Sequence, residues 1–192
     1  MITHRWIGAV ALLLLAATPA SAHIGQHLEF SAAGGFAHPF MGLDHMAAMI
    51  AVGMWSAMGG GKRVWIWPAA FVGAMLAGAC MGHAGIGLPA VEPAIALSVI
   101  VLGSLVAFGV KAPVPVGAVL VAAFAIFHGH AHGAEAPTEG WLGYAAGFAA
   151  ATALLHIIGI GLGIGIQRSL GALPVRALGA ATAVLGVFIF VS

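Results

Sequence analysis

Charged residues are scarce in this sequence. Only 6% of its 192 residues are Asp, Glu, Lys or Arg, and the net charge is +1, whereas about a quarter of the residues in an ordinary soluble domain are charged. Six basic and five acidic side chains cannot solvate the surface of a folded chain of 19.2 kDa, which excludes a soluble globular domain. The sequence contains no run of Lys or Arg, and this excludes a protein that binds the phosphates of nucleic acids.

Cysteine and the common catalytic motifs are also missing. The single cysteine, Cys80, excludes an internal disulfide and a metal site built from several thiolates. The segment around Lys62 is not a phosphate-binding loop, because Ser56 stands in place of its first glycine and Arg63 in place of its final Ser or Thr. Neither an HExxH zinc helix nor a GxSxG elbow occurs. We therefore expect no ATP, no nucleic acid and no permanently bound cofactor.

Apolar residues dominate instead, at 62% of the chain with a mean hydropathy of +1.11. Six apolar stretches approach the roughly 20 residues that a helix needs to cross a bilayer, and Gly and Pro mark the breaks between them. These stretches cover about residues 36–58, 65–82, 91–109, 114–131, 141–164 and 173–191. The sequence predicts an all-α polytopic membrane protein with six transmembrane helices in a compact Gly-rich bundle. Glycines four residues apart, as at Gly78/Gly82 and Gly161/Gly165, would let the helix backbones approach closely.

Residues 1–22 have the features of a signal peptide. Arg5 supplies the positive region, an apolar core follows, and Ala20-Ser21-Ala22 fits a cleavage site. An uncleaved first helix is the alternative, but an apolar core of about eleven residues is too short to cross a bilayer. We therefore expect a mature chain that begins at His23 and forms a single transmembrane domain over residues 23–192.

The remaining charges predict the orientation of this domain. With the mature N-terminus outside and six crossings, three loops face the cytoplasm, and these loops contain all the cations that remain after cleavage. The cations are Lys62, Arg63, Lys111, Arg168 and Arg176, whereas the outer segments contain Glu29, Glu92, Glu135 and Glu139. This distribution follows the positive-inside rule. It predicts an inner-membrane protein with both mature termini in the periplasm.

The ten histidines need an explanation, because ionisable side chains are costly in lipid. The first apolar stretch contains His38, Asp44 and His45. On a continuous helix His38 and His45 lie on one face, because seven residues make nearly two turns. A carboxylate inside the membrane costs a few kcal/mol unless it is paired or binds a cation. Asp44 therefore either forms a hydrogen bond with a histidine that fixes this helix to a neighbour or, as we favour, serves a cation site.

The fourth stretch ends in FHGHAHGAE, which contains His128, His130, His132 and Glu135. If the helix continues through this segment, His128 and His132 share a face and His130 points away. This end faces outward, as His38 does, so we expect one cluster at the outer level of the membrane. Imidazoles and carboxylates without thiolates suit a divalent first-row metal ion such as nickel, cobalt, zinc or copper.

Four further residues extend the predicted metal path. His83 closes the second stretch and Glu92 opens the third, both on the outer side. Glu92 also has a simpler interpretation, because an acid stabilises the N-terminal end of a helix. His156 lies alone in the fifth stretch and is either a packing partner or an inner relay point. His23 would capture metal outside the membrane, unless it is only solvated.

Two motifs resemble those of the HupE/UreJ family of nickel permeases. The family's HPxxGxDH motif matches His38 to His45, and its FHGxAHGxE motif matches Phe127 to Glu135. The resemblance extends over the whole mature chain. It implies metal-path positions at His38, Asp44, His45, His128, His132 and Glu135, with Glu92 as a further acid. His130 falls at a variable position of the second motif.

The resemblance implies a secondary transporter or facilitator, not an enzyme, that imports Ni²⁺ from the periplasm for hydrogenase or urease maturation. A Co²⁺ importer of the same type is one alternative. A second is an intramembrane zinc hydrolase with histidine ligands and Asp44 as base, although the sequence shows no polar groups to orient a substrate. A metal sensor that transports nothing is a third. The oligomeric state stays open.

Overall fold

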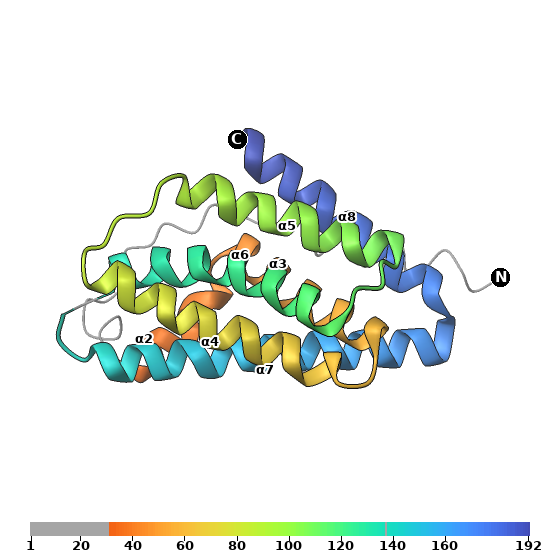
Figure 1. Cartoon of the computed structure of the whole chain (residues 1–192), viewed down its shortest axis with the longest axis horizontal. Helices are drawn as coiled ribbons and strands as arrows, with labels where there is room; N and C mark the ends of the chain where they lie inside the picture. The colour runs from red at the N-terminus through yellow and green to blue at the C-terminus, as the bar shows by residue number, and fades with distance from the viewer. Residues whose placement is uncertain (1–30, 137) are drawn as a thin grey trace.

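The computed structural model describes residues 31–136 and 138–192, and all regular elements within these ranges are helices (Figure 1). The long helices are α3 (Leu43–Gly59), α4 (Arg63–His83), α5 (Val91–Phe108), α6 (Val114–Glu135), α7 (Trp141–Leu170) and α8 (Ala172–Val191). A short helix α2 (Ala32–Ala37) and a 3-10 turn η1 (His38–Phe40) precede them. The predicted all-α fold is confirmed for this part of the chain. The predicted signal peptide, His23 and Glu29 lie outside the described residues.

Five helices, α4 to α8, are long and apolar enough to cross a membrane. Helix α3 has 17 residues, which is the lower end of the range for a spanning helix. The prediction of one continuous helix from about residue 36 is wrong, because α3 begins only at Leu43. Pro39 has no N–H group for a helical hydrogen bond, and Gly42 adopts an extended backbone with φ −104° and ψ 118°. His38 therefore lies in η1 and not on the same helix as His45.

The helices pack most extensively in three pairs: α4 with α6, α5 with α8, and α3 with α7. Glycines allow the close approach in these pairs. A Cβ atom at Gly78 would overlap the backbone of α6, and one at Gly159 would overlap the backbone of α3. The close approach predicted for Gly161/Gly165 is wrong, because no atom of a neighbouring element lies within 4 Å of a Cβ built at either position.

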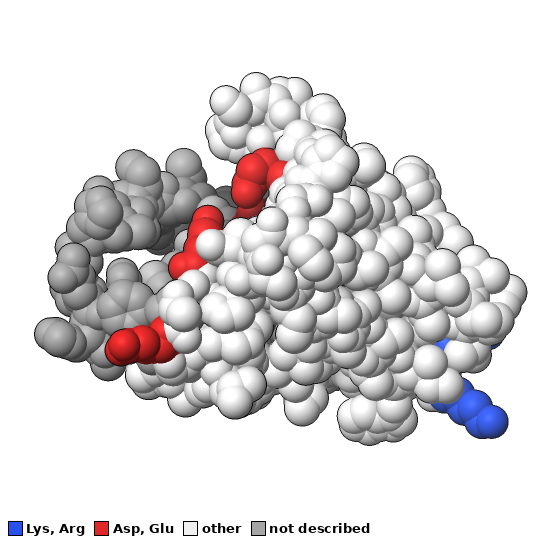
Figure 2. Space-filling view, turned by 60° about the vertical axis from the view of Figure 1, so that its left-hand side comes forward, with Lys and Arg blue, Asp and Glu red and all other residues white. Residues whose placement is uncertain are grey.

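Charged residues lie at opposite ends of the bundle. Short connections join the long helices, which alternate in direction along the chain (Figure 1). The acidic end, where α3, α5 and α7 begin, carries Asp44, Glu92, Glu135 and Glu139. The basic end, where α4, α6 and α8 begin, carries Lys62, Arg63, Lys111, Arg168 and Arg176. Figure 2 shows acidic and basic side chains at opposite ends of the molecule.

Two tryptophans close the basic end. Trp55 of α3 and Trp67 of α4 stack with their ring centroids 4.1 Å apart. Their indole N–H groups donate to the carbonyl oxygens of Val110 and Val114, at 2.8 and 2.9 Å. Arg63 donates to one carbonyl at the end of α3 and to another in the connection between α5 and α6. The basic end is therefore tied together by hydrogen bonds to the main chain.

Candidate metal centre

Histidines of η1, α3 and α6 meet inside the acidic half of the bundle. The ring of His45 on α3 lies 4.7 Å from that of His128 and 4.3 Å from that of His132, measured between centroids. The His38 ring, held by η1, lies 4.5 Å from that of His132. Because α6 continues to Glu135, His128 and His132 share a face, as predicted. We call His38, His45, His128 and His132 the histidine cluster.

The glycines of the FHGHAHGAE segment position this face of α6. A Cβ atom at Gly129 would overlap the Met75 carbonyl of α4, and one at Gly133 would overlap the Ala79 carbonyl. These glycines therefore let the α6 backbone lie directly against α4. Any larger side chain would push α6 away from α4 and displace the histidine that precedes each glycine.

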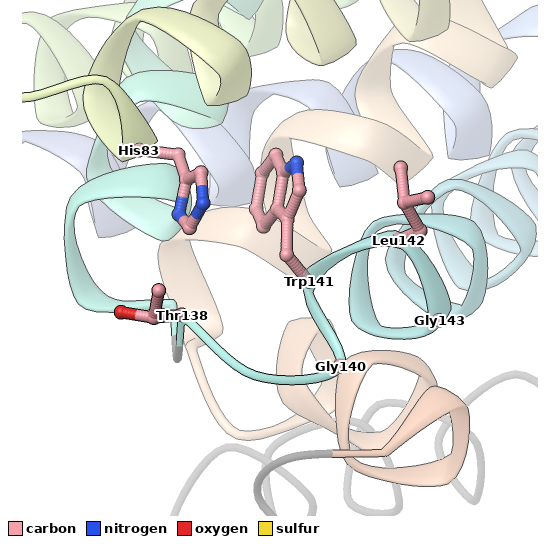
Figure 3. A pocket seen from close by; sticks show the side chains of 6 residues that line it. All are labelled: His83, Thr138, Gly140, Trp141, Leu142 and Gly143. Atoms are coloured by element: carbon pink, nitrogen blue, oxygen red, sulfur yellow. The ribbon is translucent and has the colours of Figure 1, made fainter.

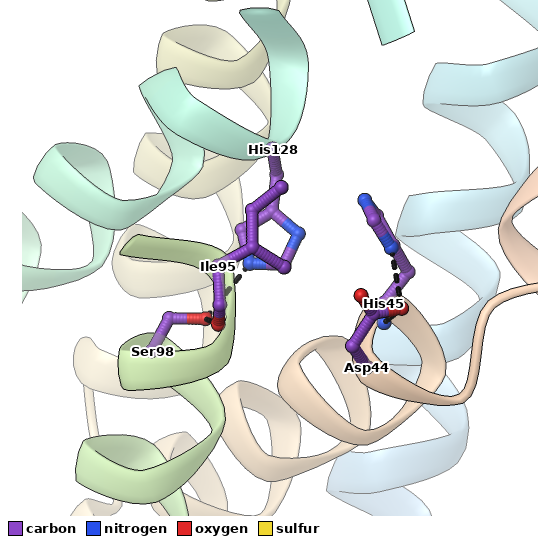
Figure 4. A network of polar contacts seen from close by, with 5 residues as sticks. All are labelled: Asp44, His45, Ile95, Ser98 and His128. Atoms are coloured by element: carbon purple, nitrogen blue, oxygen red, sulfur yellow. Dashed lines mark hydrogen bonds and ion pairs between the residues drawn. The ribbon is translucent and has the colours of Figure 1, made fainter. Parts of the chain in front are cut away.

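Asp44 fixes the orientation of His45. One oxygen of its carboxylate, Oδ1, accepts hydrogen bonds from the backbone N–H of His45 and from ring atom Nδ1, both at 2.7 Å (Figure 4). An ionised carboxylate can only accept, so Nδ1 carries the proton and Nε2 carries the lone pair. The Nε2 atom is buried and has no hydrogen-bond partner within the described residues. The Asp44–His45 pair therefore presents one bare nitrogen lone pair to the cluster.

Ser98 of α5 fixes the orientation of the His128 ring. Its hydroxyl donates its one proton to the Ile95 carbonyl at 2.6 Å, so its oxygen accepts from Nε2 of His128 at 2.8 Å (Figure 4). The neutral His128 ring then carries its lone pair on Nδ1, which is buried and unpaired among the described residues. The sequence reasoning missed Ser98. A polar residue inside an apolar span was the signal that could have found it.

His132 lies at the centre of the cluster and is 4% exposed, with neither ring nitrogen hydrogen-bonded within the described part of the chain. Together with His38 and Glu135 it can offer three ligand atoms that all lie within 4.8 Å of one another. Glu135 is exposed and His38 is half-buried, so this set of ligands extends from the buried His132 to the surface at the acidic end. Two imidazoles and a carboxylate at this separation are a ligand set for a divalent first-row metal ion.

Aromatic rings border the histidine cluster on its inner sides. Phe148 of α7 contacts His132 with a centroid distance of 4.2 Å, and Phe71 of α4 contacts His128 at 5.7 Å. Both phenylalanines are almost fully buried. Their rings offer no hydrogen bond to the unpaired nitrogens of the cluster. Sequence reasoning missed both, because a buried phenylalanine is ordinary in an apolar helix.

Other predicted metal-path residues lie apart from the cluster. The Nε2 atom of His130 donates to the Ile86 carbonyl at 2.7 Å, so this ring points away from His45, as predicted. Glu92 is exposed in the first turn of α5 and forms no ion pair within the described residues. His83 stacks on Trp141, with centroids 4.3 Å apart and planes 4° apart, and lines a pocket of about 360 Å³ at the acidic end (Figure 3).

Comparisons with known proteins agree with the motifs that shape this site. The family described as HupE / UreJ protein matches residues 10–189. The chain belongs to the HupE/UreJ family. It is also 51% identical over 173 residues to Protein HupE of Rhizobium leguminosarum bv. viciae, which covers 90% of each chain. No solved structure matches the chain.

Membership of the HupE/UreJ family defines the broad class of the protein. The family is implicated in nickel or cobalt transport for hydrogenase and urease, and it is not a known enzyme family. Together with the apolar helices α4 to α8, this makes the chain a multi-pass membrane protein. Both HupE/UreJ-like motifs, at His38–His45 and at Phe127–Glu135, contribute side chains to the histidine cluster.

Proposed function

We propose that the protein is a facilitator or secondary transporter that carries a divalent transition metal ion, Ni²⁺ first, from the periplasm into the cytoplasm. The observation that carries the proposal is that the rings of His45, His128 and His132, from two helices, meet in one place and that each has a buried, unpaired nitrogen. Each lone pair replaces a water molecule of a hydrated cation. Imidazoles release such an ion more readily than thiolates do, which suits passage better than storage.

In this proposal the acidic end faces the periplasm, and α3 crosses the membrane together with α4 to α8, which gives six crossings. The cations at the basic end then lie in the cytoplasm, in agreement with the positive-inside rule. The ion first meets Glu135 and His38 near the surface, reaches the buried His132 with them, and then moves inward to His45 and His128. The charge of Asp44 lowers the electrostatic barrier for a cation at this depth.

The membrane potential is sufficient to drive import without ATP. A potential of about 100 mV, negative inside, favours entry by about 2.3 kcal/mol per charge, or roughly 4.6 kcal/mol for a divalent ion. This free energy supports about a thousandfold accumulation. In the cell the ion would supply hydrogenase or urease maturation.

Flux into proteoliposomes tests the proposal. The purified protein is reconstituted into liposomes that enclose a Ni²⁺-sensitive dye, and a membrane potential that is negative inside is imposed. We expect Ni²⁺ entry that depends on the protein and increases with the potential, and competition with Co²⁺ ranks the two ions. A complete lack of flux for both ions would overturn the proposal. An intramembrane zinc hydrolase would instead turn over a substrate, and a sensor would bind the ion without moving it.

A further inference from the structure

His156 is a buried histidine that lies outside the histidine cluster. It is placed in the middle of α7 and is 1% exposed. Neither of its ring nitrogens has a hydrogen-bond partner among the described residues. A satisfied packing histidine would donate its N–H group to a carbonyl, as His130 does to Ile86. His156 therefore does not have the contacts that a purely structural role requires.

The position of His156 continues the line of the cluster toward the basic end. Its ring contacts Phe71 with a centroid distance of 5.0 Å, and the same Phe71 ring contacts His128 of the cluster at 5.7 Å. Trp67 lies one helical turn from Phe71 on α4, on the side of the basic end. His156 thus packs at the level between the histidine cluster and the tryptophan pair that closes the basic end.

Two further buried donor groups lie one helical turn away, Thr152 from His156 on α7 and Met75 from Phe71 on α4. Thr152 is one turn away on the same face of α7, and its hydroxyl donates to the Met75 sulfur at 3.4 Å. Met75 in turn lies one turn from Phe71 on α4. Thr152 and Met75 are both fully buried. The site combines an imidazole nitrogen, a hydroxyl oxygen and a thioether sulfur, and it contains no carboxylate among the described residues.

We propose that His156, with Thr152 and Met75, forms a second and weaker metal station through which the ion leaves the histidine cluster. The inference rests on the proposed transport function. A neutral site with a single imidazole holds a divalent ion less tightly than the cluster does, and a transport path needs such a site because an ion that binds tightly does not leave. The station sets the rate of passage, whereas the cluster sets the affinity for the external ion.

The first test separates these two quantities in proteoliposomes. His156→Leu should lower the maximal rate of Ni²⁺ uptake at least tenfold, and it should change the Ni²⁺ concentration for half-maximal uptake less than threefold. Leu154→Ala, on the exposed surface of the same helix, is the matched control and should keep the parental rate. Uptake by His156→Leu at the parental rate would overturn the inference.

A second test does not depend on transport or on tolerance of leucine. Cys80 is the single cysteine, so in a Cys80→Ser background any cysteine that is introduced is the single thiol of the protein. In that background His156→Cys should give a thiolate-to-cobalt charge-transfer band when Co²⁺ is added, whereas Leu154→Cys should give none. Absence of the band in a folded His156→Cys protein would overturn the station. Absence of Ni²⁺ flux in the Cys80→Ser parent would instead overturn the proposed function.

Discussion

Buried side-chain nitrogen atoms have hydrogen-bond partners at the basic end of the bundle, whereas several lack a partner among the described residues toward the acidic end. At the basic end the nitrogens of Trp55, Trp67 and Arg63 donate to main-chain carbonyls. Toward the acidic end and the centre, the described residues include seven buried side-chain atoms without a partner, and all seven are imidazole nitrogens. No tryptophan, arginine, serine or threonine belongs to this group.

This difference separates polar groups that stabilise the fold through hydrogen bonds from polar groups that are available to a ligand. A buried polar atom without a partner costs about 1–3 kcal/mol, and the basic end shows that this chain can pair such atoms. Four of the seven unpaired nitrogens lie on the rings of His45, His128 and His132, and this grouping is a feature of a binding site. The paired tryptophans, in contrast, are a feature of a closed end.

The largest effect is expected at the centre of the histidine cluster. His132→Ala removes the ring that contacts both His38 and His45. We expect Ni²⁺ uptake to fall by about 100-fold or more, because even the outer partners of metal ligands are worth about 10- to 100-fold. The measurement is uptake of radioactive Ni²⁺, normalised to the membrane-inserted protein.

His130→Gln is the matched control for this experiment, since His130 lies two residues away on the same helix and its ring donates to the Ile86 carbonyl. Its uptake should stay within a few-fold of the parent. If the two variants lose uptake equally, the ring with no hydrogen bond and the ring with one to the main chain are equivalent, and the comparison fails.

Asp44 should have the next largest effect. Asp44→Ala removes the acceptor that fixes the proton on Nδ1 of His45, and it also removes a negative charge. We expect uptake to fall by about 10- to 100-fold. Asp44→Asn keeps an acceptor oxygen and loses the charge, so its activity should lie between those of Asp44→Ala and the parent. Equal activity of Asp44→Ala and the parent would remove Asp44 from the mechanism.

Ser98 should have a smaller effect of the same kind. Ser98→Ala leaves Nε2 of His128 without its acceptor, so the lone pair is no longer held on Nδ1. We expect about a tenfold weaker apparent affinity for Ni²⁺. Ser98→Thr retains the hydroxyl and should restore the parental affinity. If Ser98→Thr behaves as Ser98→Ala does, the hydroxyl does not position His128.

These residues also show how far the sequence could predict the site. The spacing of His128 and His132 predicted a shared helix face, because α6 is continuous there. The spacing of His38 and His45 predicted a shared helix as well, and this was wrong, since the chain turns at Gly42. Their side chains still reach the same cluster, because η1 and α3 both pack against α7.

What the sequence could not predict depends on contacts between distant helices. Ser98 meets His128 only because α5 packs beside α6, and no local pattern in either helix encodes that contact. The close packing of α4 against α6 was partly predictable, because Gly78/Gly82 repeats the spacing of close-packed spans. The same spacing at Gly161/Gly165 faces open space, so the pattern alone does not identify the partner of a helix face.

The smallest effect is expected at the basic end. Trp67→Phe keeps an aromatic ring beside Trp55 and removes the hydrogen bond to the Val114 carbonyl. The free energy of unfolding should fall by about 1 kcal/mol, because that is the net contribution of one such bond, and thermal unfolding of the detergent-solubilised protein measures it. Trp65→Phe, at an exposed position of α4, is the control and should change stability less.

The apparent affinity for Ni²⁺ should stay unchanged in both variants, since neither tryptophan contacts the histidine cluster. A loss of affinity in Trp67→Phe comparable to that of Ser98→Ala would show that the closed end takes part in binding, and the division between a binding end and a closed end would no longer hold.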